Sequence, residues 1–96
     1  MAKLEYSLDA IADIDRLVNF LIKNDLAAAL DTYGVINDGL QLLIRHPKIG
    51  RLANNEKREL VISRGTTGYI AIYTFDNFLD VVIVLAIKHQ RELDFN

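Results

Sequence analysis

Apolar side chains follow two different periods along the first quarter of the chain. In residues 2–7 they alternate with polar side chains, which is typical of a strand with one buried face. From residue 9 to residue 23 they recur at intervals of three and four, so this segment is predicted to be an amphipathic helix. A side-chain oxygen of Ser7 or Asp9 can cap the first turn of this helix.

A second helical pattern covers residues 26–45. Because only residues 23–25 separate it from the first, the two helices are predicted to form an antiparallel hairpin. Pro47 disfavours helical geometry at the residue before it and therefore ends the second helix. Gly34 and Gly39 lie inside this helix and each costs about 1 kcal/mol relative to Ala. Either they permit close contact between two helices, or they are simply tolerated.

Three strands are predicted in the second half of the chain. Residues 58–64 alternate between apolar and polar side chains, whereas residues 69–75 and 79–88 are largely apolar on both faces. Strands of the latter kind usually lie in the centre of a sheet. Residues 65–68 have turn composition, and residues 76–77 (Asp-Asn) suit a tight hairpin turn because both tolerate positive φ. The three strands are therefore expected to form an antiparallel meander.

The order of these elements predicts an α+β fold. An N-terminal strand, an antiparallel helical hairpin and a three-stranded antiparallel meander together form two layers, in which the hairpin covers one face of the sheet. A chain of 96 residues has room for one domain, so we expect a single domain over residues 1–96.

The amino-acid composition excludes several classes of protein. The charged fraction of 25% and hydrophobic fraction of 51% are those of a folded, soluble domain. The absence of cysteine excludes disulfides and thiolate metal sites. Residues 1–15 carry acids throughout and lack the apolar core of a signal peptide, and no apolar run is long enough to span a membrane. We therefore expect a cytoplasmic protein without membrane contact, cofactor or metal.

Basic residues are concentrated between the second predicted helix and the strands that follow it. Residues 45–64 hold six basic residues and two acids, although the whole chain has a net charge of −2. Such asymmetry can indicate an anionic or acidic partner. A solvated connection between two halves of the fold explains the same pattern, and the residues alone leave both interpretations open.

Several local strings resemble the RelE/ParE toxin superfamily of type II toxin–antitoxin systems. They are the helix opening DAIADIDRLVNFL, the string LAAAL in the second helix, the link HPKIGR, and the strand segments RELVI, YIAIY and VIVLAIKHQRE. Together they cover nearly the whole chain, and the likeness is closest to the ParE branch. The fold that this resemblance implies is the one predicted above.

The resemblance implies a small cytoplasmic toxin with two protein partners. ParE-like members inhibit DNA gyrase by binding, and a cognate ParD-like antitoxin neutralises them. The complex represses its own operon, so the toxin meets operator DNA only through the antitoxin. By this likeness the chain is expected to act on gyrase without covalent chemistry of its own.

Two alternatives remain. RelE-type members of the superfamily cleave messenger RNA on the ribosome, which requires a general base, a general acid and cations around one phosphate. By resemblance, Arg58 matches their phosphate-holding arginine and His89 matches a histidine of some of these nucleases. Gln90 stands where they carry a catalytic tyrosine and cannot act as an acid or base. The lysine set of the RelE branch is only partly present, as Lys48 and Lys57. The other alternative is an inactive relative that only binds its antitoxin.

Individual candidates follow from this comparison. If the chain were a ribonuclease, Arg58 and His89 would be its catalytic residues. Pro47 and Gly50 are interpreted as a turn, and Tyr69 and Tyr73 as sheet core. The candidates for target binding are Arg51, Arg58, Lys88, His89 and Arg91, and those for antitoxin binding are Phe20 and Arg64.

Overall fold

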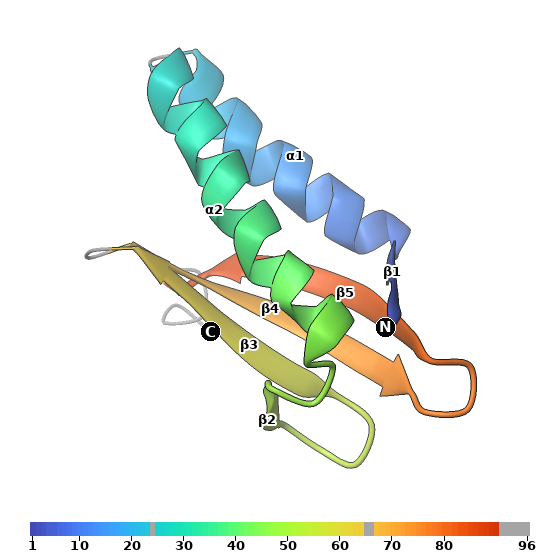
Figure 1. The fold of residues 1–96 in the computed structure, drawn as a ribbon. Helices are drawn as coiled ribbons and strands as arrows, with labels where there is room; N and C mark the ends of the chain where they lie inside the picture. Colours follow the sequence, from blue (N-terminus) through green and yellow to red (C-terminus); the bar gives the residue numbers. More distant parts are fainter. Residues whose placement is uncertain (24, 65–66, 91–96) are drawn as a thin grey trace.

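The fold has two layers, a helical hairpin and a sheet (Figure 1). The structure is a computed structural model that describes residues 1–23, 25–64 and 67–90, apart from the side chains of residues 63, 64 and 67. Helices α1 (Leu8–Ile22) and α2 (Leu26–Arg45) lie side by side and cover one face of a five-stranded sheet of order β1-β5-β4-β3-β2. The strands are β1 (Lys3–Tyr6), β2 (Arg51–Leu52), β3 (Arg58–Arg64), β4 (Thr67–Asp76) and β5 (Val81–His89). The predicted α+β fold is confirmed.

The sheet is mixed rather than antiparallel throughout. Strands β3, β4 and β5 form the predicted antiparallel meander. Strand β1 pairs in parallel with β5, with Lys3 opposite Val81, because the helical hairpin returns the chain to the same end of the sheet. The two-residue strand β2 adds an antiparallel edge beside β3, which the sequence pattern did not predict.

Side chains at the start of α1 complete the outer edge of β5. Strand β1 pairs with β5 only as far as Val84, so the rest of this edge has no neighbouring strand. The Ser7 hydroxyl caps α1 and also donates to the carbonyl oxygen of Leu85 at 3.0 Å. Nearly two helical turns further on, Oδ2 of the buried Asp13 accepts from the backbone N–H of Ile87 at 3.0 Å. Helix α1 therefore satisfies backbone groups that would otherwise be unpaired.

The core lies between the helices and the inner face of the sheet. Tyr73 is fully buried in its centre and Tyr69 lies at its edge, so the prediction that both tyrosines belong to the core is confirmed. Ala10 and three residues of α2 pack against apolar side chains of β3, β4 and β5. The buried hydrophobic residues of this cluster, besides the two tyrosines, are Ala2, Ala10, Ile36, Leu40, Leu43, Ile62, Ala71, Val82, Val84 and Ile87.

The two glycines of α2 have different surroundings. A Cβ atom added to Gly39 would lie 2.8 Å from Cγ1 of Ile62, so this glycine lets the helix approach strand β3 rather than the other helix. A Cβ added to Gly34 would meet no atom within 4 Å. Close packing therefore explains Gly39 and does not explain Gly34.

The far end of the hairpin extends beyond the sheet (Figure 1). For this reason the larger side chains in the first half of the predicted apolar stripe of α2 are exposed, although Ala29 is buried. Leu26, Leu30 and Tyr33 are exposed, whereas Ile36 and Leu40 are buried. The pattern was correct for the helix but did not show how far the sheet reaches along it.

The β4–β5 turn is longer than the predicted two-residue hairpin. Strand β4 continues to Asp76, and the turn occupies residues 77–80. Oδ1 of Asp76 accepts from the backbone N–H groups of Phe78 and Leu79, both at 2.9 Å. The positive φ falls at Asp80, with a value of 55°, rather than at the two residues that were predicted to form the turn.

Candidate functional site

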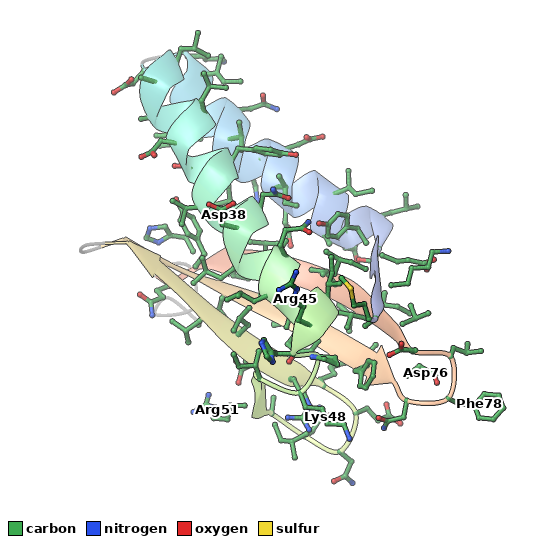
Figure 2. The ribbon with its side chains drawn as sticks, in the orientation of Figure 1. Asp38, Arg45, Lys48, Arg51, Asp76 and Phe78 are labelled. Carbon is green, nitrogen blue, oxygen red and sulfur yellow. The ribbon has the colours of Figure 1, made fainter. Side chains whose placement is uncertain are left out.

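The predicted site residues fall into two groups at different ends of the sheet. The first is the basic connection, defined here as residues 45–58, which runs from the end of α2 through β2 to the start of β3. Figure 2 shows Arg45, Lys48 and Arg51 on this part of the molecule. All three are exposed, as are His46 and Lys57. The basic connection therefore presents several cations to solvent.

A hydrogen bond to the core fixes the backbone of the basic connection. The buried N–H of Gly50 donates to the hydroxyl of Tyr73 at 2.8 Å. A Cβ atom at Gly50 would lie 2.6 Å from that hydroxyl oxygen, so only glycine fits without displacement. Burial raises the pKa of Tyr73, while the bond from Gly50 and the charge of Arg58 act in the opposite direction. Gly50 is thus part of a turn, as predicted.

The guanidinium of Arg58 also holds this turn. Nη1 of Arg58 donates to the carbonyl oxygens of Gly50 at 2.8 Å and Lys48 at 3.1 Å, and the side chain is half-buried. Arg51 is different, because its side chain is 81% exposed and contacts Oε1 of Glu59 at 3.0 Å. An ion pair that is this exposed contributes little to stability. Arg51 is therefore the more accessible of the two predicted target-binding arginines in the basic connection.

The second group lies at the end of β5. Nζ of Lys88 lies 3.3 Å from Oδ1 of Asp13, and the guanidinium of Arg16 lies 3.5 Å from the same oxygen. The ring of His89 meets the ring of Tyr69 edge-on, with 5.3 Å between their centres. Lys88 and His89 are thus neighbours, as the sequence implies, and each contacts another element of the fold.

Asp13 was not among the predicted site residues. It accepts from the backbone of β5 and contacts two cations, which makes it the polar centre of this second group. The sequence contained a signal, because Asp13 lies three residues after Ala10 and four before Leu17 on the apolar stripe of the helix. A carboxylate on such a stripe needs buried partners.

The two residues proposed for ribonuclease chemistry are far apart. Arg58 pairs with Tyr73 of β4, whereas His89 pairs with Tyr69, four positions further along the sheet and on the other side of β4. Strand geometry gives about 13 Å for four positions and about 10 Å for two strand spacings, so the Cα atoms are roughly 16 Å apart. The structure therefore does not bring Arg58 and His89 to one point.

The remaining candidates are placed as follows. Phe20 lies in the last two turns of α1 and is 76% exposed. The side chain of Arg64 and the whole of Arg91 lie outside the described residues. In the described ranges, no three His, Asp or Glu side chains are grouped as a metal site requires. No helix in these ranges is long and apolar enough to cross a membrane.

Comparison with known proteins places this fold among bacterial toxins. The chain is 28% identical over 92 residues to Toxin RelE3 of Caulobacter vibrioides, a match that covers 96% of this chain and 98% of that protein. Its fold matches a chain of the chromosomal ParDE toxin–antitoxin system from P. aeruginosa, with a TM-score of 0.74 and 19% identity, over 93% of this chain and 96% of that chain. It also matches a chain of the E. coli RelBE toxin–antitoxin complex, with a TM-score of 0.68 and 14% identity, over 92% and 95%.

A family model covers nearly the same part of the chain as these pairwise matches. The model of the ParE toxin of the type II toxin–antitoxin system parDE matches residues 4–94, which contain both helices and all five strands apart from Lys3, the first residue of β1. The chain therefore belongs to the family of ParE toxins of type II toxin–antitoxin systems.

Proposed function

We propose that this toxin inhibits DNA gyrase by binding it, without covalent chemistry of its own, and that a cognate ParD-like antitoxin neutralises it. The observation that carries the proposal is the separation of Arg58 and His89 across the sheet. A nuclease must place a base, an acid and a cation around one phosphate. The Cα atoms of Arg58 and His89 are roughly 16 Å apart, and each side chain contacts other residues, which argues against their meeting at one phosphate.

The immediate surroundings of these residues support the same conclusion. Nη1 of Arg58 is engaged by two backbone carbonyls of the basic connection. The residue after His89 is Gln90, whose amide neither gives nor takes a proton at neutral pH. Binding needs no such proton transfer, and the exposed cations of the basic connection are available for it.

The exposed apolar side chains near the end of the helical hairpin are the proposed contact surface for the antitoxin. Phe20, Leu26, Leu30 and Tyr33 are all more than half exposed near the end of the hairpin that extends past the sheet. An exposed apolar surface of this kind is typical of a protein interface. We propose that the antitoxin covers it, that operator DNA is contacted only through the antitoxin, and that the toxin acts in the cytoplasm.

The ribosome-dependent ribonuclease is the second candidate. It is favoured by the name of the relative from Caulobacter vibrioides, Toxin RelE3. It is also compatible with the exposed cations Lys48 and Lys57, which match part of the lysine set of RelE-type nucleases. An inactive relative that only binds its antitoxin is the third.

Purified components separate these functions. We expect the chain to inhibit supercoiling by gyrase in the absence of ribosomes, and to leave messenger RNA on ribosomes intact. Adding the cognate antitoxin should restore supercoiling. Cleavage of ribosome-bound messenger with unimpaired gyrase would instead establish the ribonuclease, and normal growth of cells that express the chain alone would establish the inactive relative.

A matched pair of variants tests the surface. Arg51→Ala removes an exposed cation from the basic connection, and Lys23→Ala removes one from the far end of the hairpin. Inhibition of gyrase should weaken about tenfold in the first variant and remain unchanged in the second. Equal inhibition by both variants would show that Arg51 does not contact the target.

A further inference from the structure

The β4–β5 turn presents an unusually exposed aromatic side chain. Phe78 is 95% exposed and its neighbour Leu79 is 66% exposed. Figure 2 shows Phe78 pointing away from the rest of the molecule. The turn itself is held in place, because Asp76 accepts from both backbone N–H groups and the carbonyl of Asp80 accepts from Lys3 at 2.9 Å. Because these bonds already order the backbone of the turn, binding through Phe78 loses little backbone entropy.

A shallow apolar depression lies close to this turn. It is lined by His46, Pro47, Lys48 and Ile49 at the start of the basic connection and has a volume of about 440 Å³. The depression and the turn are neighbours because consecutive residues of the N-terminal segment bond to both regions. The N–H of Ala2 donates to Ile44, just before the depression, and that of Lys3 donates to Asp80 in the turn, each at 2.9 Å.

The two features also carry opposite charge. Asp76 and Asp80, on either side of Phe78, are exposed acids. Lys48 lines the depression, and Arg45 lies one residue before the first lining residue, so both place positive charge beside it. Because Phe78 is almost fully exposed, it does not fill the depression of its own chain. One surface of the protein thus contains both an acidic apolar projection and a basic apolar recess.

We propose that two copies of this chain associate about a two-fold axis, with Phe78 of each copy inserted in the depression of the other. Such an interface is isologous, so every favourable contact is made twice. The ring would lie against Pro47 and Ile49, and Asp80 would lie near Lys48 of the second copy. The small net charge of −2 opposes association only weakly.

The expected association is weak. A turn and a recess of this size bury less than the roughly 1,200–2,000 Å² of a standard stable interface, which points to a dissociation constant on the order of tens of micromolar. The second copy is preferred over another partner because one chain carries both an apolar projection flanked by acids and an apolar recess flanked by cations. This proposal does not rest on gyrase being the target.

Sedimentation velocity on the purified chain, from about 1 to 300 µM, tests the proposal. The wild type should shift from monomer to dimer over this range. Phe78→Ser should weaken association at least tenfold, whereas Phe20→Ser, which removes another exposed phenylalanine, should associate like the wild type. Asp80→Asn keeps a residue that tolerates positive φ and should weaken association several-fold. Raising the salt concentration should weaken it as well.

A covalent trap provides a second measurement, because the chain has no cysteine. The Ile49→Cys and Asn77→Cys variants are mixed and oxidised. The yield of disulfide-linked dimer from this mixture should exceed the yield from either variant alone. A wild type that stays monomeric at all concentrations would overturn the proposal, as would equal effects of the Phe78 and Phe20 variants. If the wild type is monomeric and Phe78→Ser nevertheless abolishes growth arrest, the turn docks on a different protein and the dimer is wrong.

Discussion

Replacing Asp13 by Ala tests whether helix α1 holds the edge of β5 through this carboxylate. The substitution leaves the buried N–H of Ile87 without an acceptor, which costs about 1–3 kcal/mol. Lys88 is about one-third exposed and regains water, so losing this contact adds at most about 1 kcal/mol. The two contributions together span about 1–4 kcal/mol, so the free energy of unfolding should fall by about 2–3 kcal/mol at the middle of this range.

Urea denaturation measures this difference, and Asp15→Ala is the matched control. Asp15 is exposed on the same helix, so this variant gains the same helix propensity without losing a buried contact. For a domain of this size the Asp13 variant should also melt roughly 10–20 °C lower than the control. Asp13→Asn keeps an oxygen that accepts from Ile87 and should lose only about 1 kcal/mol. If Asp13→Ala and Asp15→Ala unfold within about 0.5 kcal/mol of each other, the carboxylate does not stabilise this edge.

Three further outcomes are expected from the packing around the glycines and Tyr73. Gly34→Ala should raise the free energy of unfolding by about 1 kcal/mol. Gly39→Ala should not raise it, because the added Cβ would lie 2.8 Å from Cγ1 of Ile62. Thermal melting of both variants checks this difference. Gly50→Ala should lower the free energy of unfolding by about 1–3 kcal/mol in the same assay, because the added Cβ would displace the Tyr73 hydroxyl. Burial raises the pKa of Tyr73, so the unfolded chain loses this proton first and stability should decline as pH rises above about 10. That decline should be smaller in Tyr73→Phe, and an unchanged decline in urea titrations would contradict the assignment.

Elements with strong local signals could be predicted from the sequence. Helix α2 spans Leu26–Arg45, as predicted, because Pro47 and the apolar period define its end. Strand β3 spans Arg58–Arg64, also as predicted, because its alternating pattern begins and ends at those residues. Residues that face the core in these segments were mostly identified, since one face of each is apolar.

Features that depend on long-range contacts could not be predicted in this way. The parallel pairing of β1 with β5 joins residues at opposite ends of the chain, and β2 has only two residues. The first half of the apolar stripe of α2 is largely exposed because it lies beyond the end of the sheet. The separation of Arg58 and His89 follows from the pairing register of three strands. No single segment of the sequence contains this information. The likeness of Arg58 and His89 to nuclease residues therefore suggested one site, whereas the two residues lie at separate places on the sheet.

The pairing of the first strand with the last has a consequence for biosynthesis. Ser7 and Leu85, which are hydrogen-bonded, are 78 residues apart in the sequence. At ~5–20 residues per second the ribosome needs roughly 4–16 seconds to synthesise the intervening chain. During this time the N-terminal segment has no sheet to join, and loop closure over such a distance comes late in folding. A nascent chain therefore cannot complete its sheet until β5 has been synthesised, so any surface that spans β1 and β5 forms only after that point.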